Sequence, residues 1–426
     1  MAMQNYVKRD LFDKAAKHLS NKEISLIIGP RQVGKTVLVK QLQEYLIKEK
    51  KIDPQSIYYF NLDIIKDREL FEDQSEFIEF LKQKSAKKKI YVFVDEAQKA
   101  KEAGVFFKGV YDSDLLVKLI LTGSSSLEIR SKIHESLTGR KRVFNLLPFS
   151  FLEILSYKNT ELRGLIVNKR KIFARDHKEL LRIFLDYSIF GGYPQAALAQ
   201  DNEEKIEFLK EIFTSYIEKD IIGFLRVENE SNFNKLVKLL AAQTGNLINI
   251  AELSSLVNTD RYTVDRYLLN LEKTFVAYSL KPFYSNPRQE LVKASKIYFY
   301  DNGLRNLSLE NFKKPFADRQ DKGALLENAV FKELLILKHV KNFNLKFWRS
   351  KQKAEVDFII EKGLDVFPVE VKSNLSSDKL EAGLSGFISR YNPKKAFVVN
   401  LGFQGRKKIR GTEVFFIYPY ELANYI

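Results

Sequence analysis

The first third of the chain alternates short apolar runs with segments whose apolar residues recur at helical spacing. Apolar runs of strand length occupy Ile24–Ile28 and Ile90–Val94. Between them, the apolar positions of residues 37–46 recur every three or four residues, which is typical of a helix buried on one face. Strands that alternate with helices in this way form a parallel sheet covered by helices. We therefore predict an α/β core over residues 1–160.

The C-terminal part of the chain shows a different order of elements. The pattern predicts a helix, three strands, a helix and a strand, over residues 323–340, 345–350, 354–360, 364–373, 379–392 and 395–402. This order indicates an α/β sandwich over residues 323–426. The polar, turn-rich stretch Leu309–Gly323 belongs to a linker that we place at residues 291–322.

Composition adds an expectation about size and partners. A chain of 426 residues exceeds one typical core, so we expect two to four domains. It carries 70 Lys and Arg against 54 Asp and Glu, a formal net charge of +16. Such an excess favours a polyanionic partner, most simply DNA, and basic clusters at residues 84–90 and 405–411 are suited to a phosphate backbone. The alternative is a lysine-rich composition without functional meaning.

Several classes of site and location are disfavoured. The sequence contains no cysteine, which excludes disulfides and thiolate metal sites, and its four histidines have no metal-ligand spacing. No uncharged apolar run approaches the ~20 residues that a membrane helix needs. The first residues lack the apolar region of a signal peptide. We therefore expect a cytoplasmic chain with no membrane partner.

The segment after the first apolar run carries the strongest chemical signal. It reads GPRQVGKTV, which is G-x-x-x-x-G-K-T between a predicted strand and a predicted helix. Glycines allow backbone N–H groups to surround phosphates, and the helix N-terminus adds partial positive charge. We expect Lys35 to reach the β- and γ-phosphates of ATP and Thr36 to bind Mg²⁺. The predicted nucleotide site comprises Gly29, Pro30, Arg31, Gln32, Val33, Gly34, Lys35, Thr36 and Val37.

The second apolar run ends in two carboxylates, Asp95 and Glu96. The carboxyl ends of parallel strands are where α/β sheets bind ligands. Asp95 is expected to hold Mg²⁺ and Glu96 to polarise the attacking water. A third predicted strand ends at Thr122, followed by Ser124 and Ser125, and a hydroxyl there could sense the γ-phosphate. Ser125 could equally cap the helix that follows.

Two further positions are candidates for nucleotide contacts. Arg140 lies on a loop, and an arginine directed at a γ-phosphate accelerates hydrolysis by several orders of magnitude. It could also be a surface charge. Pro194 follows Gly191 and Gly192 at a predicted helix start, where proline is favoured.

The loop, VFVDEAQ, TGSSS, LTGR, LLPFSFLE and GGYP, in this order, resemble a family of prokaryotic AAA-type ATPases and the related signal-transducing ATPases with numerous domains. The resemblance covers residues 11–220. It implies a P-loop core, a helical lid at residues 161–245, ATP and Mg²⁺ as cofactors, and contact of Pro194 with the base. It also implies that the arginine at position 140 acts within one subunit of a homo-oligomer, between subunits, or not at all.

Residues 246–290 resemble a winged helix-turn-helix, because two short helical patterns and a turn precede an extended segment. In such a module the second helix can enter the major groove. The expected DNA-reading residues are Arg261, Tyr262, Thr263 and Arg266. The helix also carries Asp265 and Glu272, so internal docking is an equally open reading.

Charged residues on the predicted C-terminal strands form a second candidate site. Glu355 and Asp357 share one face of their strand, and Glu370 and Lys372 share one face of theirs. Acids in an apolar strand are costly to bury unless they are paired or bound to a cation. Asp357 and Glu370 on neighbouring strands could therefore meet on one Mg²⁺, with Lys372 beside them.

The spacing Asp-x₁₂-Glu-x-Lys behind a helix that bears Glu327 resembles the PD-(D/E)XK nuclease superfamily over residues 323–403. The resemblance implies that Asp357 and Glu370 ligate metal, that Lys372 activates or orients water, and that Glu327 is an auxiliary acid. The proline that often precedes the aspartate is absent. The alternative is an ion pair of Lys372 with Glu370 or Asp357 on a fold that has lost catalysis.

We therefore expect an α/β multidomain protein with a parallel-sheet P-loop ATPase core, a helical lid, a winged helix-turn-helix and a PD-(D/E)XK-like domain. Its expected function is ATP hydrolysis coupled to DNA binding and Mg²⁺-dependent DNA cleavage. The rival is a nucleotide-dependent switch that binds DNA or protein and has an inactive nuclease-like domain. A protein remodeller is a third, weaker possibility.

Overall fold

The computed structural model describes residues 6–124, 136–215, 229–284, 294–312 and 314–426. The predicted hydroxyl of Ser125 therefore lies outside the described residues. The chain divides into two compact units. Unit 1 is mainly Met1–Leu147, and unit 2 consists of Pro148–Ser215, Leu225–Glu272 and Val276–Ile426. The predicted core boundary at residue 160 thus falls thirteen residues inside unit 2, since α6 (Phe151–Lys158) belongs to the second unit.

Unit 1 is built on a five-stranded sheet in the order β2-β3-β4-β1-β5. Every neighbouring pair is parallel. The strands are β1 (Ile24–Gly29), β2 (Ile57–Asn61), β3 (Ile90–Asp95), β4 (Val117–Ser124) and β5 (Lys141–Asn145). The predicted parallel sheet is confirmed, and the central strands β1 and β3 are buried along their whole length because helices cover both faces.

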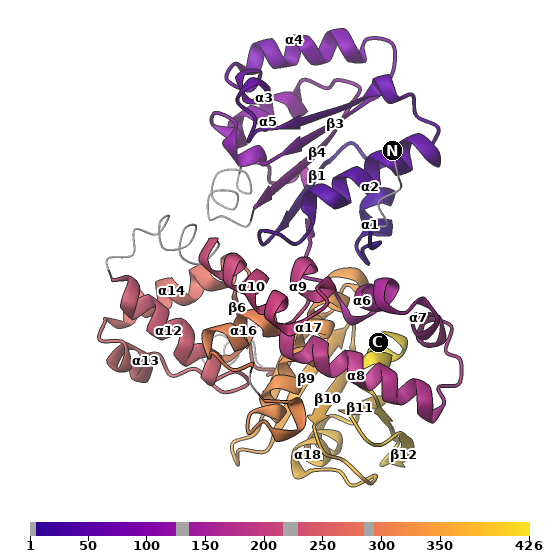
Figure 1. Ribbon diagram of the computed structural model, residues 1–426, viewed down its shortest axis with the longest axis vertical. Helices are drawn as coiled ribbons and strands as arrows, with labels where there is room; N and C mark the ends of the chain where they lie inside the picture. The colour runs from indigo at the N-terminus through magenta and orange to yellow at the C-terminus, as the bar shows by residue number, and fades with distance from the viewer. Residues whose placement is uncertain (1–5, 125–135, 216–228, 285–293, 313) are drawn as a thin grey trace. The chain divides into compact units, whose positions relative to one another are not determined.

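Those helices are α1 (Phe12–Lys17), α2 (Lys35–Lys48), α3 (Ile65–Glu69), α4 (Gln74–Ser85) and α5 (Ala103–Asp112). Figure 1 shows α1 and α2 on one side of the sheet and α3, α4 and α5 on the other. Helix α4 begins where the side chain of Asp73 accepts hydrogen bonds from the backbone N–H groups of Ser75 and Glu76.

Unit 2 begins with helices across most of the range predicted as a lid. They are α6, α7 (Thr160–Val167), α8 (Ala174–Phe190), α9 (Pro194–Leu198), α10 (Asn202–Phe213) and α12 (Glu230–Ala242). Helix α6 starts in a capping box, in which Ser150 and Glu153 bond each other's backbone N–H groups.

The segment predicted as a winged helix-turn-helix contains α13 (Ile250–Leu256) and α14 (Arg261–Lys273), followed by β6 (Ala277–Leu280). Strand β6 pairs antiparallel with β7 (Lys296–Phe299). Helix, turn, helix and strand thus occur in the expected order, and the winged-helix assignment stays a prediction.

Residues 291–322 are not a linker, so that prediction is wrong. Besides β7, they hold α16 (Asn302–Ser308) and a short 3₁₀ helix, Phe316–Asp318. The guanidinium of Arg305 is 1% exposed and donates to Asp321 at 2.7 Å. Polar composition suggested a solvated segment, whereas these polar groups satisfy one another in the interior.

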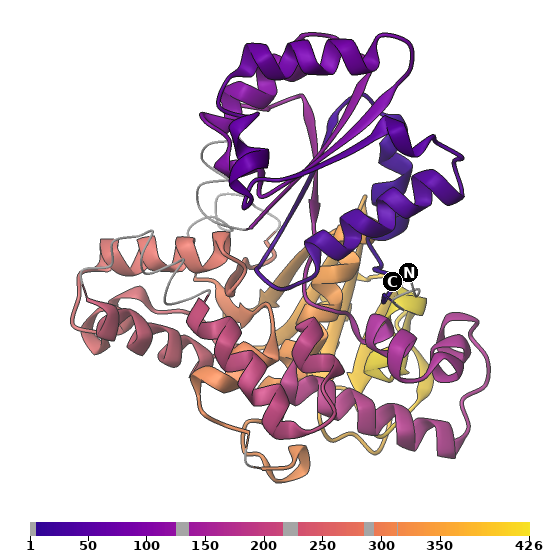
Figure 2. The ribbon, with the colours of Figure 1, turned by 45° about the horizontal axis from the view of Figure 1, so that its top comes forward.

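The C-terminal part of unit 2 is a six-stranded sheet in the order β12-β13-β11-β10-β9-β8. Its strands are β8 (Asn344–Arg349), β9 (Glu355–Lys362), β10 (Asp365–Lys372), β11 (Lys395–Asn400), β12 (Gly405–Ile409) and β13 (Thr412–Ile417). Its helices are α17 (Lys322–Lys341), α18 (Ala382–Tyr391) and α19 (Leu422–Tyr425) (Figures 1 and 2).

The predicted order of helix, three strands, helix and strand is confirmed from α17 to β11. The hairpin of β12 and β13 was missed, because the basic stretch at residues 405–411 hides its strand pattern. None of the described helices is long and apolar enough to cross a membrane.

Because of one buried lysine, Lys118, the free energy of unfolding of unit 1 is expected to depend on pH. Lys118 on β4 is 0% exposed, its ammonium donates to the backbone carbonyl of Glu23, and burial lowers its pKa from 10.5 to about 7. Between those values the unfolded chain binds a proton that the folded chain releases, so the free energy of unfolding must rise with pH. We expect the rise in the wild type to exceed that in Lys118→Met by about 2–4 kcal/mol. Urea unfolding of both proteins from pH 7 to pH 10.5 measures it, and parallel curves would contradict it.

Candidate functional site

The loop between β1 and α2 has the backbone that a phosphate site needs. Gly34 adopts φ +90° directly before the first residue of α2, and Gln32 also has a positive φ of 59°. A Cβ at Gly29 would lie 2.1 Å from the carbonyl oxygen of Leu146, so only glycine fits there. The loop therefore directs its N–H groups inward at a helix N-terminus, which is an anion-binding arrangement.

Lys35 and Thr36 are placed at the first turn of α2. Lys35 is 7% exposed, and its ammonium donates to the carbonyl oxygens of Gly29 and Pro30 at 3.2 and 3.0 Å. The Thr36 hydroxyl donates to Asp95 Oδ2 at 2.6 Å. The two expected Mg²⁺-binding side chains thus come from different elements and meet directly.

Asp95 receives hydroxyl groups from three directions. Besides Thr36, it accepts hydrogen bonds from Tyr59 at 3.2 Å on β2 and from Thr122 on β4. Thr122 was a candidate sensor of the γ-phosphate, and its hydroxyl is engaged with Asp95. Tyr59 was missed by the sequence prediction. Burial and the nearby Asp95 carboxylate raise the pKa of Tyr59, so it stays a donor at neutral pH.

Glu96, the predicted water-polarising residue, follows β3 in a left-handed conformation, φ 55°. Its backbone N–H donates to the Thr122 hydroxyl at 3.3 Å, and its carboxylate accepts from Gln98 Nε2 at 2.6 Å. A non-glycine residue with positive φ at a site edge is strained, and strain of this kind collects at functional sites.

Arg9 lies outside the phosphate loop and stabilises it. The sequence analysis missed this residue, because the surrounding residues 8–10 (KRD) form no recognisable motif. Its guanidinium donates to the carbonyl oxygen of Val33 at 2.6 Å and to that of Leu147, and the residue is 5% exposed. These charge-assisted hydrogen bonds hold the end of the phosphate loop, at Val33, close to the chain that follows β5, at Leu147.

The described geometry moves Arg140 away from the phosphates of its own chain. Its backbone carbonyl bonds the N–H of Ile24, at the start of β1, whereas the phosphate loop follows the other end of that strand. Its guanidinium forms a two-point ion pair with Asp112 at 2.7 and 3.1 Å. This position gives no support to action within one chain, and whether Arg140 acts between subunits or not at all stays a prediction.

The GGYP motif lies in unit 2, where its glycines are required by packing. Gly191 adopts φ +77°, and a Cβ there would lie 1.8 Å from Asp301 Oδ1. Asp301 Oδ2 accepts from the Gly192 N–H and from the Lys332 ammonium, both at 2.7 Å. Asp301 and Lys332 were missed. Pro194 is the first residue of α9, as predicted, and its contact with the base stays a prediction.

The predicted DNA-reading residues gather on the first turns of α14. Tyr262 is 77% exposed, and Arg261 and Arg266 are exposed as well. Thr263 is used locally, because its N–H and hydroxyl bond the Asp260 carboxylate at 2.9 and 2.6 Å. The structure therefore presents two arginines and a tyrosine to solvent and leaves Thr263 as part of the helix cap.

The predicted nuclease residues do come together in unit 2. Lys372 pairs with Glu370 at 2.9 Å on β10, and Asp357 Oδ2 accepts from the Val371 N–H at 2.8 Å. Glu327 reaches the same region from α17, because one lysine ammonium lies within 3.8 Å of Glu327, Glu355 and Asp357. Burial and the charge of Asp357 raise the pKa of Glu327 to about 7. Burial and Asp357 likewise raise the pKa of Glu370 to about 8.

Two residues of β7 that the sequence prediction missed complete this acidic cluster. The ammonium of Lys296 lies 2.5 Å from Glu355, 3.5 Å from Glu327 and 3.8 Å from Asp357. The Tyr298 hydroxyl donates to Glu327 at 2.5 Å. Both residues fall inside the stretch, residues 291–322, that we had taken as a linker, so no sequence signal placed them there.

A divalent ion does not fit the cluster as the structure has it. An ammonium already lies against three of the carboxylates that would surround the ion, and Lys372 neutralises Glu370. Across the part of the chain that the structure describes, no three Asp, Glu or His side chains are arranged to hold a metal. Binding of Mg²⁺ by Asp357 and Glu370 stays a prediction that this arrangement disfavours.

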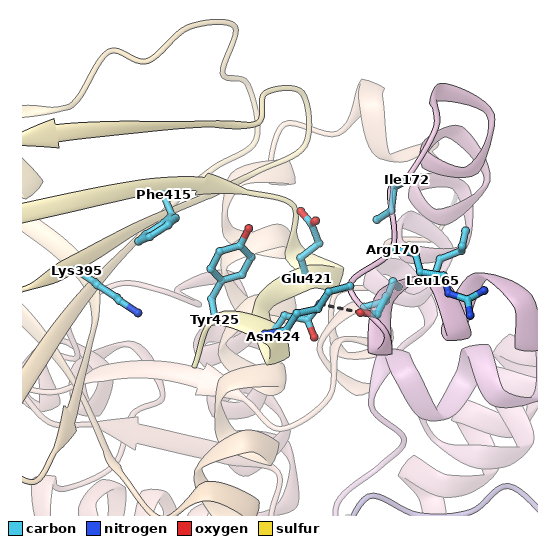
Figure 3. A pocket seen from close by; sticks show the side chains of 10 residues that line it. Leu165, Arg170, Ile172, Lys395, Phe415, Glu421, Asn424 and Tyr425 are labelled. Atoms are coloured by element: carbon cyan, nitrogen blue, oxygen red, sulfur yellow. Dashed lines mark hydrogen bonds between the residues drawn. The ribbon is translucent and has the colours of Figure 1, made fainter.

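A pocket of about 370 Å³ lies elsewhere in unit 2. Figure 3 shows Tyr425, Glu421 and Asn424 of the C-terminal segment between Lys395 and Leu165, with the Asn424 amide bonded to the Ile166 carbonyl at 2.9 Å. The pocket contains none of the predicted site residues, and Glu421 is its one carboxylate among the lining residues.

Substitution of Arg9 tests its support of the phosphate loop. Arg9→Ala leaves the carbonyls of Val33 and Leu147 without this donor and loosens the loop. We expect the Kd for a fluorescent ATP analogue to rise about tenfold, since ~1.4 kcal/mol of loop ordering is then paid on binding. Lys40→Ala, an exposed cation on α2, is the control. An unchanged Kd for Arg9→Ala would show that the loop keeps its shape unaided.

Family descriptions match three segments of the chain. Residues 21–155 match an AAA domain. Residues 181–315 match the domain of unknown function DUF8612, and residues 322–420 match the domain of unknown function DUF4143. The AAA match covers the phosphate loop and Asp95, so the AAA-type P-loop assignment is confirmed for this part of the chain.

Relatives match along most of the length. An uncharacterized protein of Haemophilus influenzae is 26% identical over 401 residues, 92% of this chain and 93% of that protein. Uncharacterized protein MJ1544 of Methanocaldococcus jannaschii is 30% identical over 354 residues, 82% of this chain and 74% of that protein. The solved structure of C. elegans PCH-2 covers 48% of this chain and 59% of that chain at 15% identity, with a TM-score of 0.28 that carries no further conclusion. By the extent of its match to MJ1544, this chain belongs to the same protein family, with an AAA domain at residues 21–155.

Proposed function

We propose that this chain is an ATP-hydrolysing switch that acts on DNA through the exposed face of α14. The observation that carries the proposal is the 2.6 Å bond between Thr36 and Asp95 at the mouth of a glycine-containing phosphate loop. It joins the two oxygen groups that P-loop enzymes use for Mg²⁺ to the loop that surrounds the phosphates. The donor set, a hydroxyl and a carboxylate, fits a hard cation.

Each residue of the site has a separate task. Lys35 exchanges its bonds with the loop carbonyls for the β- and γ-phosphates. Thr36 and Asp95 would hold the Mg²⁺ that accompanies ATP, and this ion supplies charge neutralisation at the transferred phosphoryl group. Glu96 accepts a hydrogen bond from the attacking water once its present partner, Gln98, releases it.

The GGYP motif is hydrogen-bonded, through Asp301, to the first helix of the C-terminal domain. Lys332 bonds the aspartate that holds Gly192, and the next residue of α17, Glu333, accepts from the Phe151 N–H at 3.0 Å. Two of the motifs that carry the ATPase resemblance, GGYP with Gly192 and LLPFSFLE with Phe151, are thus connected to α17. Contact of Pro194 with ATP would therefore be felt by α17.

DNA is the partner that charge and exposure favour. The net charge is +16, and the first turns of α14 present Arg261, Tyr262 and Arg266 to solvent. A protein partner for the same face is the alternative. We do not extend the proposal to DNA cleavage, because the ammonium groups of Lys296 and Lys372 already lie against the carboxylates of the acidic cluster.

The ATP site is tested by two substitutions with different outcomes. Lys35→Ala removes the phosphate contact, so both ATP binding and turnover should be lost. Glu96→Gln keeps the phosphate contacts and removes the group that orients water, so ATP should bind normally while turnover falls by at least about 100-fold. Phosphate release and equilibrium binding separate the two. Full turnover in Lys35→Ala would refute the assignment.

Salt dependence of binding tests the DNA proposal. Each phosphate contact contributes a log–log slope of about −0.9 in salt. The double substitution Arg261→Ala/Arg266→Ala should therefore lower the magnitude of the slope by about 1.8, measured by fluorescence anisotropy on duplex DNA. Lys235→Ala, an exposed cation on α12, should leave it unchanged. A flat salt response of the wild type would favour a protein partner instead.

A further inference from the structure

The acidic cluster of unit 2 is organised around a lysine side chain. Lys296 is 2% exposed and lies on β7, outside the C-terminal sheet that carries Glu355 and Asp357. Its ammonium contacts carboxylates from two further elements, β9 and α17. The ammonium is within hydrogen-bond distance of Glu355 and Glu327, and Asp357 at 3.8 Å adds a third nearby negative charge.

The charge of this lysine is stable in its place. Burial of an ammonium is costly, but the carboxylates of Glu355, Glu327 and Asp357 lie 2.5, 3.5 and 3.8 Å from it and favour its charged form. A cation with three anionic neighbours occupies the position that electrostatics would otherwise offer to a metal ion. Lys296 thus supplies from within the chain a positive charge that offsets part of the cost of burying these carboxylates.

We propose that Lys296 is the built-in cation of this site and replaces a divalent metal there. The C-terminal domain then keeps the acidic residues of a nuclease-like site and uses them to hold β7. Because β7 pairs with β6, which follows α14 in sequence, the contact fastens the hairpin behind the proposed reading helix to the C-terminal sheet. The backbone bond from the Phe283 N–H to the Phe347 carbonyl, at 2.5 Å, joins the same two parts.

A single unpartnered oxygen does not overturn this view. Glu370 Oε2 is buried without a hydrogen-bond partner among the described residues. Its other oxygen is bound by Lys372, which also pairs with Glu381 at 3.0 Å. Asp357, which would have to share the ion with Glu370, has the Lys296 ammonium 3.8 Å away, so the free oxygen has no uncommitted carboxylate beside it.

The decisive experiment removes the lysine and asks whether a metal takes its place. In Lys296→Met the three carboxylates lose their counter-charge, so the midpoint of thermal unfolding should fall by at least about 5 °C. Without the ammonium between them, the three carboxylates are free to close on an ion, so the variant should also gain one Mn²⁺ site, seen by electron paramagnetic resonance on the nucleotide-free full chain. Saturating Mn²⁺ should restore most of the lost midpoint in Lys296→Met and change that of the wild type little.

Lys332→Met is the matched control, because Lys332 is equally buried in unit 2 but pairs with the single carboxylate of Asp301. It should be destabilised without gaining Mn²⁺ or being rescued by it. In Lys296→Met/Asp357→Asn the gained Mn²⁺ site should weaken at least about tenfold, since a ligand charge is lost.

Two results would overturn the proposal. One is a wild-type Mn²⁺ site that Asp357→Asn abolishes, and the other is a folded Lys296→Met that gains no site. If Lys296→Met does not fold, the comparison of wild type with Asp357→Asn decides alone, and equal Mn²⁺ binding by both supports the proposal. Failure of ATP turnover in the wild type would leave every one of these readouts intact, so the two proposals fail separately.

Discussion

The carboxylate of Asp95 is the point on which unit 1 depends. Parallel pairing places the end of β3 between the ends of β2 and β4, so hydroxyls of Tyr59 and Thr122 reach it from both neighbours, and α2 brings Thr36. A carboxylate buried at 4% exposure is stable only with such donors. The same donors orient it toward the phosphate loop. The order of β2, β3 and β4 in the sheet therefore places Asp95 and its hydroxyl donors beside the phosphate loop.

Unit 2 solves a similar problem with ammonium groups. Lys296 and Lys332 are each 2% exposed, and each joins separate elements through carboxylates. Breaking such a pair by removing one partner costs about 3–5 kcal/mol, because the remaining charge is left uncompensated. The pairs therefore act as tethers whose strength depends on both partners being present. This explains why charged residues lie where an apolar core would be expected.

The sequence was informative wherever a local pattern has one physical meaning. The glycine spacing of the phosphate loop, the apolar run into Asp95 and the helix–strand order after residue 322 each predicted the observed elements. It failed where function depends on distant partners. Arg9, Tyr59 and Lys296 lie in unremarkable surroundings, and only the folded chain brings them to Val33, Asp95 and Glu355. For Arg140 the sequence left several roles open, since loop position does not say which end of a strand the loop joins.

The acidic cluster shows how one set of residues supports two opposite inferences. Spacing on strands β9 and β10 predicts that Asp357 and Glu370 converge, and in the structure Asp357 accepts a hydrogen bond from Val371, the residue after Glu370. Convergence of acids creates a demand for positive charge, but it does not decide what meets the demand. A metal ion can supply this charge, can exchange with solvent and can activate a water molecule. A lysine supplies the charge as a permanent part of the chain. Because Lys296 lies on β7, outside the C-terminal sheet, its ion pairs with the acids hold β7 to that sheet. In this arrangement the acids serve to stabilise the fold rather than to hold a metal ion that activates water.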